Sequence, residues 1–240
     1  MEELVERWQL TVGDEYPPGA AGRVFRVERA DGSPAVLKIG FPHRESEQEA
    51  DALERWNGEG AVRLLERDDA CHALLLERCE PGTFLSESPD ALDVLVGLLP
   101  RLWTEADGFH TLADEAEHWV ESGLDSDVTR LARELAATQG ELVLVHQDLH
   151  GDNVLASERE PWLVIDPKPL AAEREFAVAP IVRSPELGDS KREALYRLDR
   201  LCSDLGLDRE RARGWTIVQT LAWSEGNTLP SHLEVVEWLR

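Results

Sequence analysis

The sequence contains no long hydrophobic run. No stretch of its 240 residues approaches the ~18 uninterrupted apolar residues of a membrane-spanning helix. The N-terminal segment MEELVERWQL also lacks a basic region followed by an apolar one, which is the pattern of a signal peptide. We therefore expect a cytoplasmic protein with no membrane partner.

Cysteine is scarce. The three cysteines, Cys71, Cys79 and Cys202, are scattered and form no C-x-x-C pair. Disulfide frameworks need more cysteines at regular spacings, and structural zinc sites use paired ones. The sequence therefore predicts reduced cysteines, with neither disulfides nor a zinc site.

The sequence also contains few positively charged residues. The 25 lysines and arginines stand against 48 aspartates and glutamates, which gives a formal net charge of -23. Such a surface repels nucleic acid and anionic membranes, and it attracts cations. A cationic small-molecule substrate would fit this charge, although a solvating exterior explains most of the acidic residues equally well.

The periodicity of the sequence predicts an α+β fold. Strands are expected over residues 8–12, 23–29, 35–39, 61–66 and 73–77, with a helix over 45–56; together these would form a five-stranded antiparallel sheet with one helix. The remainder is expected to be mainly helical, over 88–99, 112–122 and 125–138 and from Ser190, Asp208 and Ser231, which carry N-cap or capping-box signals. A chain of 240 residues can bury the core of one large domain or of two lobes.

Residues 142–168 hold the densest cluster of polar side chains. The apolar run Leu142 to Val145 leads into His146, Asp148, His150, Asp152 and Asn153, and a later apolar run ends at Asp166. Strand ends are where side chains converge on a ligand. The alternating histidines and aspartates could form a solvated turn, or they could bind a metal ion as in hydrolases.

The spacing within this cluster is typical of kinases. Asp148 and Asn153 stand at the offset H-x-D-x-x-x-x-N, and Asp166 closes a following strand as the metal-binding aspartate of a kinase does. The phrase HQDLHGDNVL from His146, followed by Ile165-Asp166-Pro167-Lys168, resembles the aminoglycoside phosphotransferase family. Within that family it is most similar to the streptomycin 6-kinase and hydroxyurea kinase branch.

This resemblance implies a two-lobed, protein-kinase-like fold. Residues 1–78 would form a nucleotide-binding lobe and residues 79–240 a catalytic and substrate-binding lobe. The implied activity is transfer of the γ-phosphate of ATP to a hydroxyl of an aminoglycoside-type antibiotic, with streptomycin first. Hydroxyurea or another small hydroxyl metabolite is the alternative acceptor, and a monomer is assumed.

Lys38 is the expected phosphate-binding lysine. It lies in the apolar segment Ala35 to Ile39, where a buried ammonium needs a carboxylate or phosphate partner; an edge strand with a solvated lysine is the alternative. The order of strand, glycine turn and strand matches the kinase strand whose lysine holds the α- and β-phosphates. Glu49 is the expected partner because it shares a helix face with Leu53, and Glu47 is its competitor.

Two segments are expected to contact the rest of the nucleotide. Residues 13–22 include Gly19 and Gly22 and stand where kinases keep a phosphate-covering loop, although an ordinary hairpin loop explains them equally well. The apolar run that begins at Leu74 passes directly into Pro-Gly, which predicts a hinge. In the resembled kinases this hinge carries the adenine on backbone groups, here near Glu77 and Cys79.

The resemblance also assigns the remaining roles. Asp148 would accept the substrate hydroxyl proton or orient it, and Asn153 and Asp166 would hold Mg²⁺. His146 would pack beneath the loop. The candidate substrate contacts are His150, Lys168 and Glu225, of which Glu225 could meet amino or guanidino groups.

One position departs from the family pattern. Relatives often carry an acidic residue that supports the catalytic loop from below, where this chain has Ala177. Glu175 could substitute for it. The loss leaves an inactive, kinase-like nucleotide-binding module open as a further alternative, beside the metal hydrolase.

Overall fold

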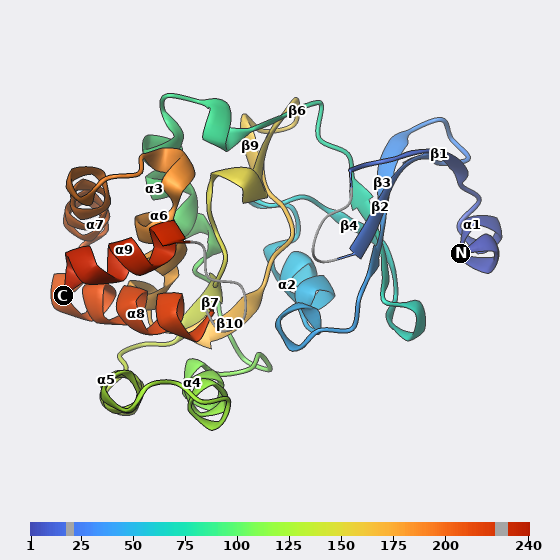
Figure 1. Ribbon diagram of the computed structural model, residues 1–240. Coiled ribbons are helices and arrows are strands. Elements are labelled where there is room, and N and C mark those ends of the chain that lie inside the picture. The colour runs from blue at the N-terminus through green and yellow to red at the C-terminus, as the bar shows by residue number, and fades with distance from the viewer. Residues whose placement is uncertain (18–21, 224–229) are drawn as a thin grey trace. The chain divides into compact units, whose positions relative to one another are not determined.

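The computed structural model describes residues 1–17, 22–223 and 230–240 (Figure 1). They form two compact units. The first unit comprises Met1–Thr83 and Leu155–Asp166, and the second comprises Phe84–Val154 and Pro167–Arg240. The predicted lobes placed all of residues 79–240 together, whereas the fold returns 155–166 to the first unit. The assignment of nucleotide binding to one lobe and catalysis to the other stays a prediction.

The first unit is built on an antiparallel sheet. Its elements are α1 (Glu2–Arg7), β1 (Thr11–Glu15), β2 (Gly22–Glu28), β3 (Pro34–Gly40), η1 (Arg44–Ser46), α2 (Glu49–Trp56), β4 (Leu64–Asp68), η2 (Asp69–Cys71), β5 (Ala73–Glu77), β6 (Pro81–Phe84), β8 (Val154–Ser157) and β9 (Trp162–Val164). Strands β1 to β5 form one sheet in the order β1-β2-β3-β5-β4, and every pairing is antiparallel. The expected five-stranded antiparallel sheet is confirmed.

The alternation of β3 places its lysine apart from its core residues. Leu37 belongs to the hydrophobic core of the sheet with Phe25, Val27 and Leu75. Because successive side chains of a strand point to opposite faces, Lys38 emerges on the other face. That face is where the buried Glu49 of α2 meets it.

Three predicted boundaries were wrong. Residues 2–7 form α1, so the first strand begins only at Thr11; acidic residues in the first turn and Arg7 in the last suit the helix dipole. The helix expected from residue 45 begins with the short η1, and α2 starts at Glu49. The strand expected from residue 61 starts at Leu64, because Ala61 and Val62 pair with Val164 instead.

Residues 155–166 join the first unit through both backbone and side-chain contacts. β6, β8 and β9 form a three-stranded sheet in the order β6-β8-β9, and the Val62 N–H donates to the Val164 carbonyl at 3.0 Å. Arg159 donates to the carbonyls of Gly58 and Ala61 at 2.7 and 2.9 Å. This hairpin carries the chain to Asp166.

The second unit is mainly helical. Its elements are η3 (Leu85–Glu87), α3 (Ala91–Leu102), α4 (Leu112–Glu121), α5 (Ser126–Ala137), β7 (Val143–His146), η4 (Gly151–Asn153), β10 (Pro169–Ala172), η5 (Arg174–Val178), α6 (Ala179–Arg183), η6 (Pro185–Leu187), α7 (Lys191–Leu205), α8 (Arg209–Ala222) and α9 (Pro230–Leu239). Helix α8 contacts α5, α6, α7 and α9, and its Trp215 is fully buried. It is therefore the central helix of this unit.

The helix starts of the second unit follow their capping signals with two exceptions. The helix expected from Ser88 begins only at Ala91. Ser190 accepts from the backbone N–H of Glu193 and donates to its carboxylate, which is the expected capping box. Asp208 caps α8. The predicted start at Ser231 was wrong, because α9 begins at Pro230, a residue that suits a first helical turn.

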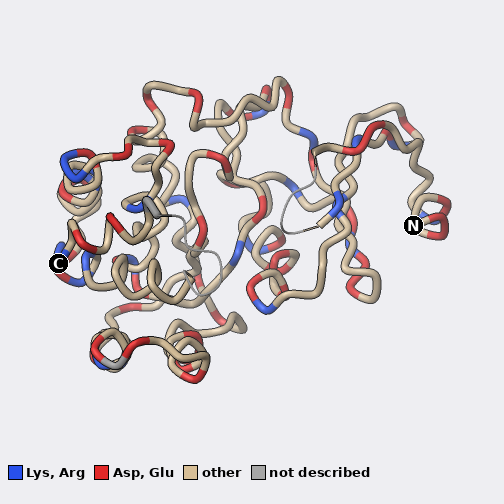
Figure 2. The backbone as a smooth tube through the Cα atoms, in the orientation of Figure 1, with Lys and Arg blue, Asp and Glu red and all other residues tan. Residues whose placement is uncertain are grey.

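Acidic residues are spread along the whole described chain rather than gathered in one segment (Figure 2). Among the helices of the described ranges, none combines the length and the apolar content that crossing a bilayer requires.

Candidate active site

Lys38 forms a buried ion-pair cluster in the first unit. Its Nζ lies 2.7 and 2.6 Å from the two carboxylate oxygens of Glu49, and it also donates to Oδ1 of Asp166. The Lys38 and Glu49 side chains are 7% and 5% exposed, and that of Asp166 is 32% exposed. The structure thus brings together three residues that the sequence singled out, and Glu49 rather than Glu47 is the partner of the lysine.

The local fold accounts for both carboxylates. Glu49 is the first residue of α2, where a helix N-terminus favours negative charge. Asp166 follows β9 and has a left-handed backbone with φ of 50°, which is uncommon for a residue other than glycine. A strained backbone at a polar cluster is typical of functional sites.

One ammonium serves two carboxylates in this cluster. Burial lowers the pKa of Lys38, but the charges of Glu49 and Asp166 outweigh it, so that the pKa of Lys38 is raised overall. Burial raises the pKa of Glu49, and the negative charge of Asp166 adds to this effect against the opposing effect of Lys38. The lysine therefore stays charged between the two carboxyl groups.

A cavity of about 430 Å³ adjoins Lys38 and Glu49 within the first unit. The connection from β3 to α2 and the turn between β4 and β5 form its other walls, with side chains of both signs, such as Arg44 and Asp69. Its described lining includes neither Gly22 nor the hinge residues. It therefore includes the expected Lys38 and Glu49 but not the other nucleotide contacts expected from the sequence.

The hinge residues hold the first unit together. The Glu77 N–H donates to the Arg63 carbonyl at 2.9 Å, and its carboxylate accepts from Arg159 Nε and Nη2 at 2.7 and 2.9 Å. Burial raises the pKa of Glu77, but the hydrogen bonds from Arg159 and from the Arg63 backbone lower it overall. Cys79 is buried, and burial raises the pKa of its thiol to about 11, so it is not a reactive thiolate. The Glu77 side chain therefore binds Arg159 within the first unit. Pairing of the adenine with the backbone of this segment stays a prediction.

We expect Arg159→Met to lower the free energy of unfolding by about 2–4 kcal/mol, because it leaves the half-buried Glu77 carboxylate without its cation and two carbonyls without their donor. Urea unfolding measures this loss. The control is Arg133→Met, which breaks an equally bidentate pair with Glu117. Its side chains are 54% and 52% exposed, so the loss of stability should be much smaller. Equal losses of unfolding free energy in the two variants would show that Arg159 does not stabilise the first unit more than an exposed ion pair does.

Gly22 has a structural reason to be glycine. Its φ is 155°, and a Cβ there would lie 2.4 Å from the Ile39 carbonyl oxygen. The close approach of β2 to β3 therefore excludes a side chain, independently of any phosphate contact. Gly19, the other glycine proposed for this loop, lies outside the described residues.

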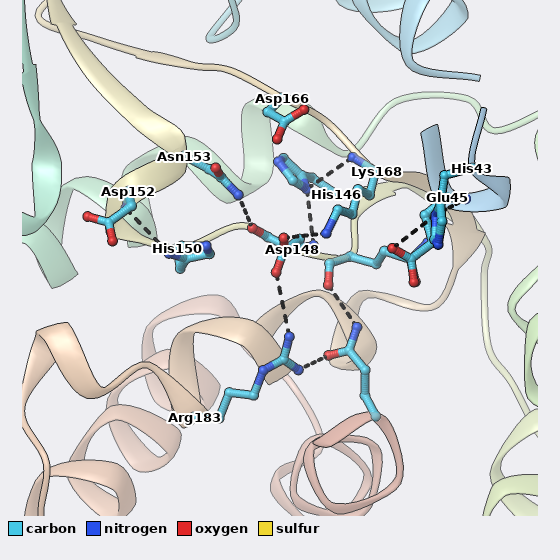
Figure 3. Close-up of polar contacts among 12 residues, drawn as sticks. His43, Glu45, His146, Asp148, His150, Asp152, Asn153, Asp166, Lys168 and Arg183 are labelled. Carbon is cyan, nitrogen blue, oxygen red and sulfur yellow. Dashed lines mark hydrogen bonds and ion pairs between the residues drawn. The ribbon is translucent and has the colours of Figure 1, made fainter. Parts of the chain in front are cut away.

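In the second unit, the pairing of β7 with β10 positions Asp148. His146 is opposite Pro169, and the Gln147 N–H donates to the Lys168 carbonyl at 2.9 Å. The ladder thus ends with Asp148 and Lys168 side by side, and Lys168 Nζ donates to Asp148 Oδ2 at 2.8 Å (Figure 3). Lys168 was expected to be a substrate or scaffold contact, and the structure shows it as a partner of the catalytic candidate.

The loop around Asp148 is held from within. His146 is buried, and its Nδ1 accepts from the Asp148 N–H at 3.1 Å, as expected of a histidine beneath the loop. Asn153 Nδ2 donates to the Asp148 carbonyl at 2.7 Å (Figure 3). This bond uses the amide nitrogen, so the amide oxygen is the atom that could meet a cation. At Gly151, a Cβ would lie 2.9 Å from three atoms of Ser86, so only glycine fits.

The support that Ala177 was thought to remove comes from another helix. Gln219 of α8 is fully buried and donates from Nε2 to the Gln147 carbonyl at 2.7 Å. The suggestion that Glu175 substitutes was wrong, because its carboxylate accepts from the Asp208 N–H at the start of α8. Gln219 lies 72 positions after Gln147, so no local pattern could have revealed it.

Arg183 is a second residue that the sequence did not reveal. It ends α6, is buried, and its Nη2 lies 3.6 Å from Asp148 Oδ1. Arg183 and Lys168 both lie over the ring of Trp223, at 4.8 and 4.9 Å from its centroid. Glu225, two positions further, lies outside the described residues.

His150 forms an ion pair with Glu186. Its Nδ1 lies 3.1 Å from Glu186 Oε1, and Ser184 donates to the same oxygen at 2.5 Å. Donor atoms of His150, Asp152 and Glu186 lie within 4.8 Å of one another, and this is the single group of metal-ligating type found among the described residues. It omits His146 and Asp148, so the alternating residues do not converge on one metal as the hydrolase interpretation requires.

The same pair predicts a pH dependence of stability. Burial raises the pKa of Glu186, but hydrogen bonds from His150 and Ser184 outweigh it and bring the pKa to about 2. Burial lowers the pKa of His150, but the bond to Glu186 and the charge of Asp148 raise it overall. The Glu186 carboxylate contributes to the stability of the fold above pH 4.5, and this contribution is lost as the pH falls towards 2. The His150 imidazole contributes to stability below pH 6.5, and this contribution is lost as the pH rises through its raised pKa.

We therefore expect Glu186→Gln to destabilise the protein most near pH 5.5, by at most about 3 kcal/mol, and less near pH 3 or 9. Urea unfolding at the three pH values measures this profile. Glu237→Gln, which alters an exposed ion pair with Arg240, should show no such maximum. A loss that does not vary with pH would exclude the pair as its origin.

Comparison with known proteins identifies the family. A family model described as "Aminoglycoside/hydroxyurea antibiotic resistance kinase" matches residues 7–224. The chain belongs to this family. A hydroxyurea phosphotransferase from Kitasatospora aureofaciens is 40% identical over 249 residues, which cover 92% of this chain and 71% of that protein. A streptomycin 6-kinase from Streptomyces glaucescens is 39% identical over 249 residues, which cover 93% and 81%.

The fold of this antibiotic resistance kinase is also found among solved structures. Choline kinase LicA from Streptococcus pneumoniae matches with a TM-score of 0.70 at 16% identity, over 99% of this chain and 98% of that one. At this level of identity the likeness concerns the fold alone. It confirms the expected kinase-like α+β fold, and the family match confirms the resemblance drawn from the motifs.

Proposed function

We propose that this protein is a kinase that transfers the γ-phosphoryl group of ATP to a hydroxyl of an aminoglycoside-type antibiotic, with streptomycin as the first candidate, and so confers resistance. The observation that carries this proposal is the 39% identity to a streptomycin 6-kinase over 93% of the chain. The formal net charge of -23 favours a cationic acceptor of this kind. A cytoplasmic location and a monomeric state complete the proposal.

Asp148 is the proposed catalytic residue. Its carboxylate would orient the acceptor hydroxyl and take up its proton as the acceptor oxygen bonds to the γ-phosphorus and the bond to the leaving ADP oxygen breaks. Lys168 and Arg183 flank this carboxylate. Their contacts would hold it in place to receive the hydroxyl.

Lys38 is proposed to hold the inner phosphates, with Glu49 as its positioning partner. The backbone of Glu77 and Cys79 is proposed for the adenine, and the loop with Gly19 and Gly22 for the phosphates. The second unit supplies the acceptor contacts, for which His150, Lys168 and Glu225 stay candidates.

Asn153 and Asp166 are the proposed Mg²⁺ ligands. Mg²⁺ prefers oxygen ligands, and an amide oxygen with a carboxylate fits this preference. The amide nitrogen of Asn153 is engaged with the Asp148 carbonyl, which leaves its oxygen as the ligand atom. Bound Mg²⁺ would supply neutralisation of phosphate charge.

Hydroxyurea is the second candidate acceptor, because the hydroxyurea phosphotransferase is 40% identical over 92% of this chain. The test supplies the purified protein with ATP, Mg²⁺ and one acceptor at a time: streptomycin, other aminoglycosides or hydroxyurea. We expect ADP release and a phosphorylated product with streptomycin, and growth of a sensitive bacterial host on streptomycin when it carries the gene. Turnover with hydroxyurea alone would transfer the proposal to that acceptor, and ATP binding without any transfer would leave an inactive module.

A further inference from the structure

Each oxygen of the Asp148 carboxylate faces its own cation. Lys168 Nζ lies 2.8 Å from Oδ2, and Arg183 Nη2 lies 3.6 Å from Oδ1 (Figure 3). The Asp148 side chain is 18% exposed. Two contacts on two different oxygens restrain the rotation of the carboxylate as well as its position.

Arg183 is fixed from two other directions. Its Nη1 donates to Oε1 of Gln219 at 2.5 Å, and its guanidinium lies 4.8 Å from the centroid of the Trp223 ring. Only 6% of its side chain is exposed. The planar guanidinium can meet a carboxylate, an amide and a ring face at once, which the point charge of a lysine cannot.

Gln219 joins this cation to the backbone beside Asp148. Its carbonyl oxygen accepts from Arg183, while its Nε2 donates to the Gln147 carbonyl at 2.7 Å. The two contacts fix the orientation of the amide, since a flipped amide would oppose donor to donor and acceptor to acceptor. One buried side chain of the central helix α8 thus holds both the residue before Asp148 and the cation at its carboxylate.

We propose that Gln219 and Arg183 are positioning residues for Asp148, which they hold in the orientation that phosphoryl transfer requires. The inference rests on the proposed function, in which Asp148 receives the acceptor hydroxyl. A buried guanidinium needs a compensating charge. The Asp148 carboxylate supplies such a charge, so its loss is expected to disturb Arg183.

Kinetics test the proposal through Gln219→Leu and Arg183→Met. We expect kcat to fall about 100-fold in each, as displaced catalytic groups do, with the KM for ATP unchanged. Arg183→Lys, which keeps the charge but not the planar contacts, should recover part of kcat. The control Thr216→Val lies on the same helix, is fully buried and loses only a bond to the Ala212 carbonyl. It should keep the wild-type kcat.

Dependence on Asp148 separates positioning from a general structural role. In an Asp148→Asn background, the added substitution Gln219→Leu or Arg183→Met should cause no further loss of the residual rate. A full additional loss would overturn the proposal. Wild-type turnover that is insensitive to Asp148→Asn would instead overturn the proposed role of Asp148.

A second measurement needs no turnover. Asp148→Asn should lower the melting temperature because it leaves Arg183 without its carboxylate, and Arg183→Met added to that variant should restore part of the loss. If the melting-temperature shifts of Asp148→Asn and Arg183→Met simply add in the double variant, Arg183 and Asp148 do not act as a pair. If no acceptor is phosphorylated, the proposed function fails while this cycle still decides whether Arg183 and Asp148 act as a pair.

Discussion

Replacement of Lys38 by methionine is expected to lower turnover by about 1000-fold or more, because the ammonium proposed for the inner phosphates is lost. The same change should lower the free energy of unfolding by about 3–5 kcal/mol, because the carboxylate of Glu49, 5% exposed, then has no cation. ADP release and urea unfolding measure the two effects on the same preparation.

A second substitution separates the two effects. Adding Glu49→Gln to Lys38→Met removes the uncompensated carboxylate and should return most of the stability but none of the turnover. Recovery of turnover in the double variant would show that Lys38 acts only through the fold. The chain offers a matched control, since its three lysines are Lys38, Lys168 and the exposed Lys191. Lys191→Met should change neither quantity.

Replacement of Asp148 by asparagine is expected to lower kcat by about 100- to 10,000-fold, because the amide keeps the shape of the side chain but takes up no proton. The KM for ATP should remain unchanged, since other residues are proposed to contact the nucleotide. Single-turnover measurement of ADP formation checks this. A variant that retains more than about a tenth of the wild-type rate would exclude proton uptake by Asp148 as a major term.

Asp152→Asn is the control for this prediction. Asp152 lies in the same loop, is exposed, and bonds to Ser86 rather than to the charges around Asp148. Its replacement should leave kcat close to the wild-type value. A loss equal to that of Asp148→Asn would mean that the loop responds to any change of charge.

Local patterns in the sequence predicted the first-unit cluster well. Lys38 in an apolar strand and Glu49 on an apolar helix face each demanded an opposite charge, and the fold pairs them at 2.6 Å. The motif around Asp148 was also recognisable in the sequence, because a fixed spacing after a strand places its residues in one loop. Short-range geometry was sufficient in both cases.

Contacts that depend on tertiary packing were not predictable in this way. Gln219 and Arg183 meet near Gln147 and Asp148 only because α6 and α8 pack together. A glutamine in the middle of a helix and an arginine at a helix end carry no sign of such a role. Likewise, residues 155–166 are tied to the first unit by Arg159, whose contacts with Gly58, Ala61 and Glu77 span 82 to 101 positions.

The Lys38 cluster has a consequence for how a nucleotide can enter. An ammonium has three hydrogens, and each has a carboxylate oxygen within reach, two on Glu49 and one on Asp166. A phosphate oxygen therefore gains the lysine only by displacing one of them, and Asp166 is the more exposed. Once Asp166 has lost its contact with Lys38, its carboxylate repels the incoming phosphate unless a divalent cation binds as well. Nucleotide and metal are thus expected to associate as a single complex, so that chelation of the metal weakens nucleotide affinity rather than turnover alone.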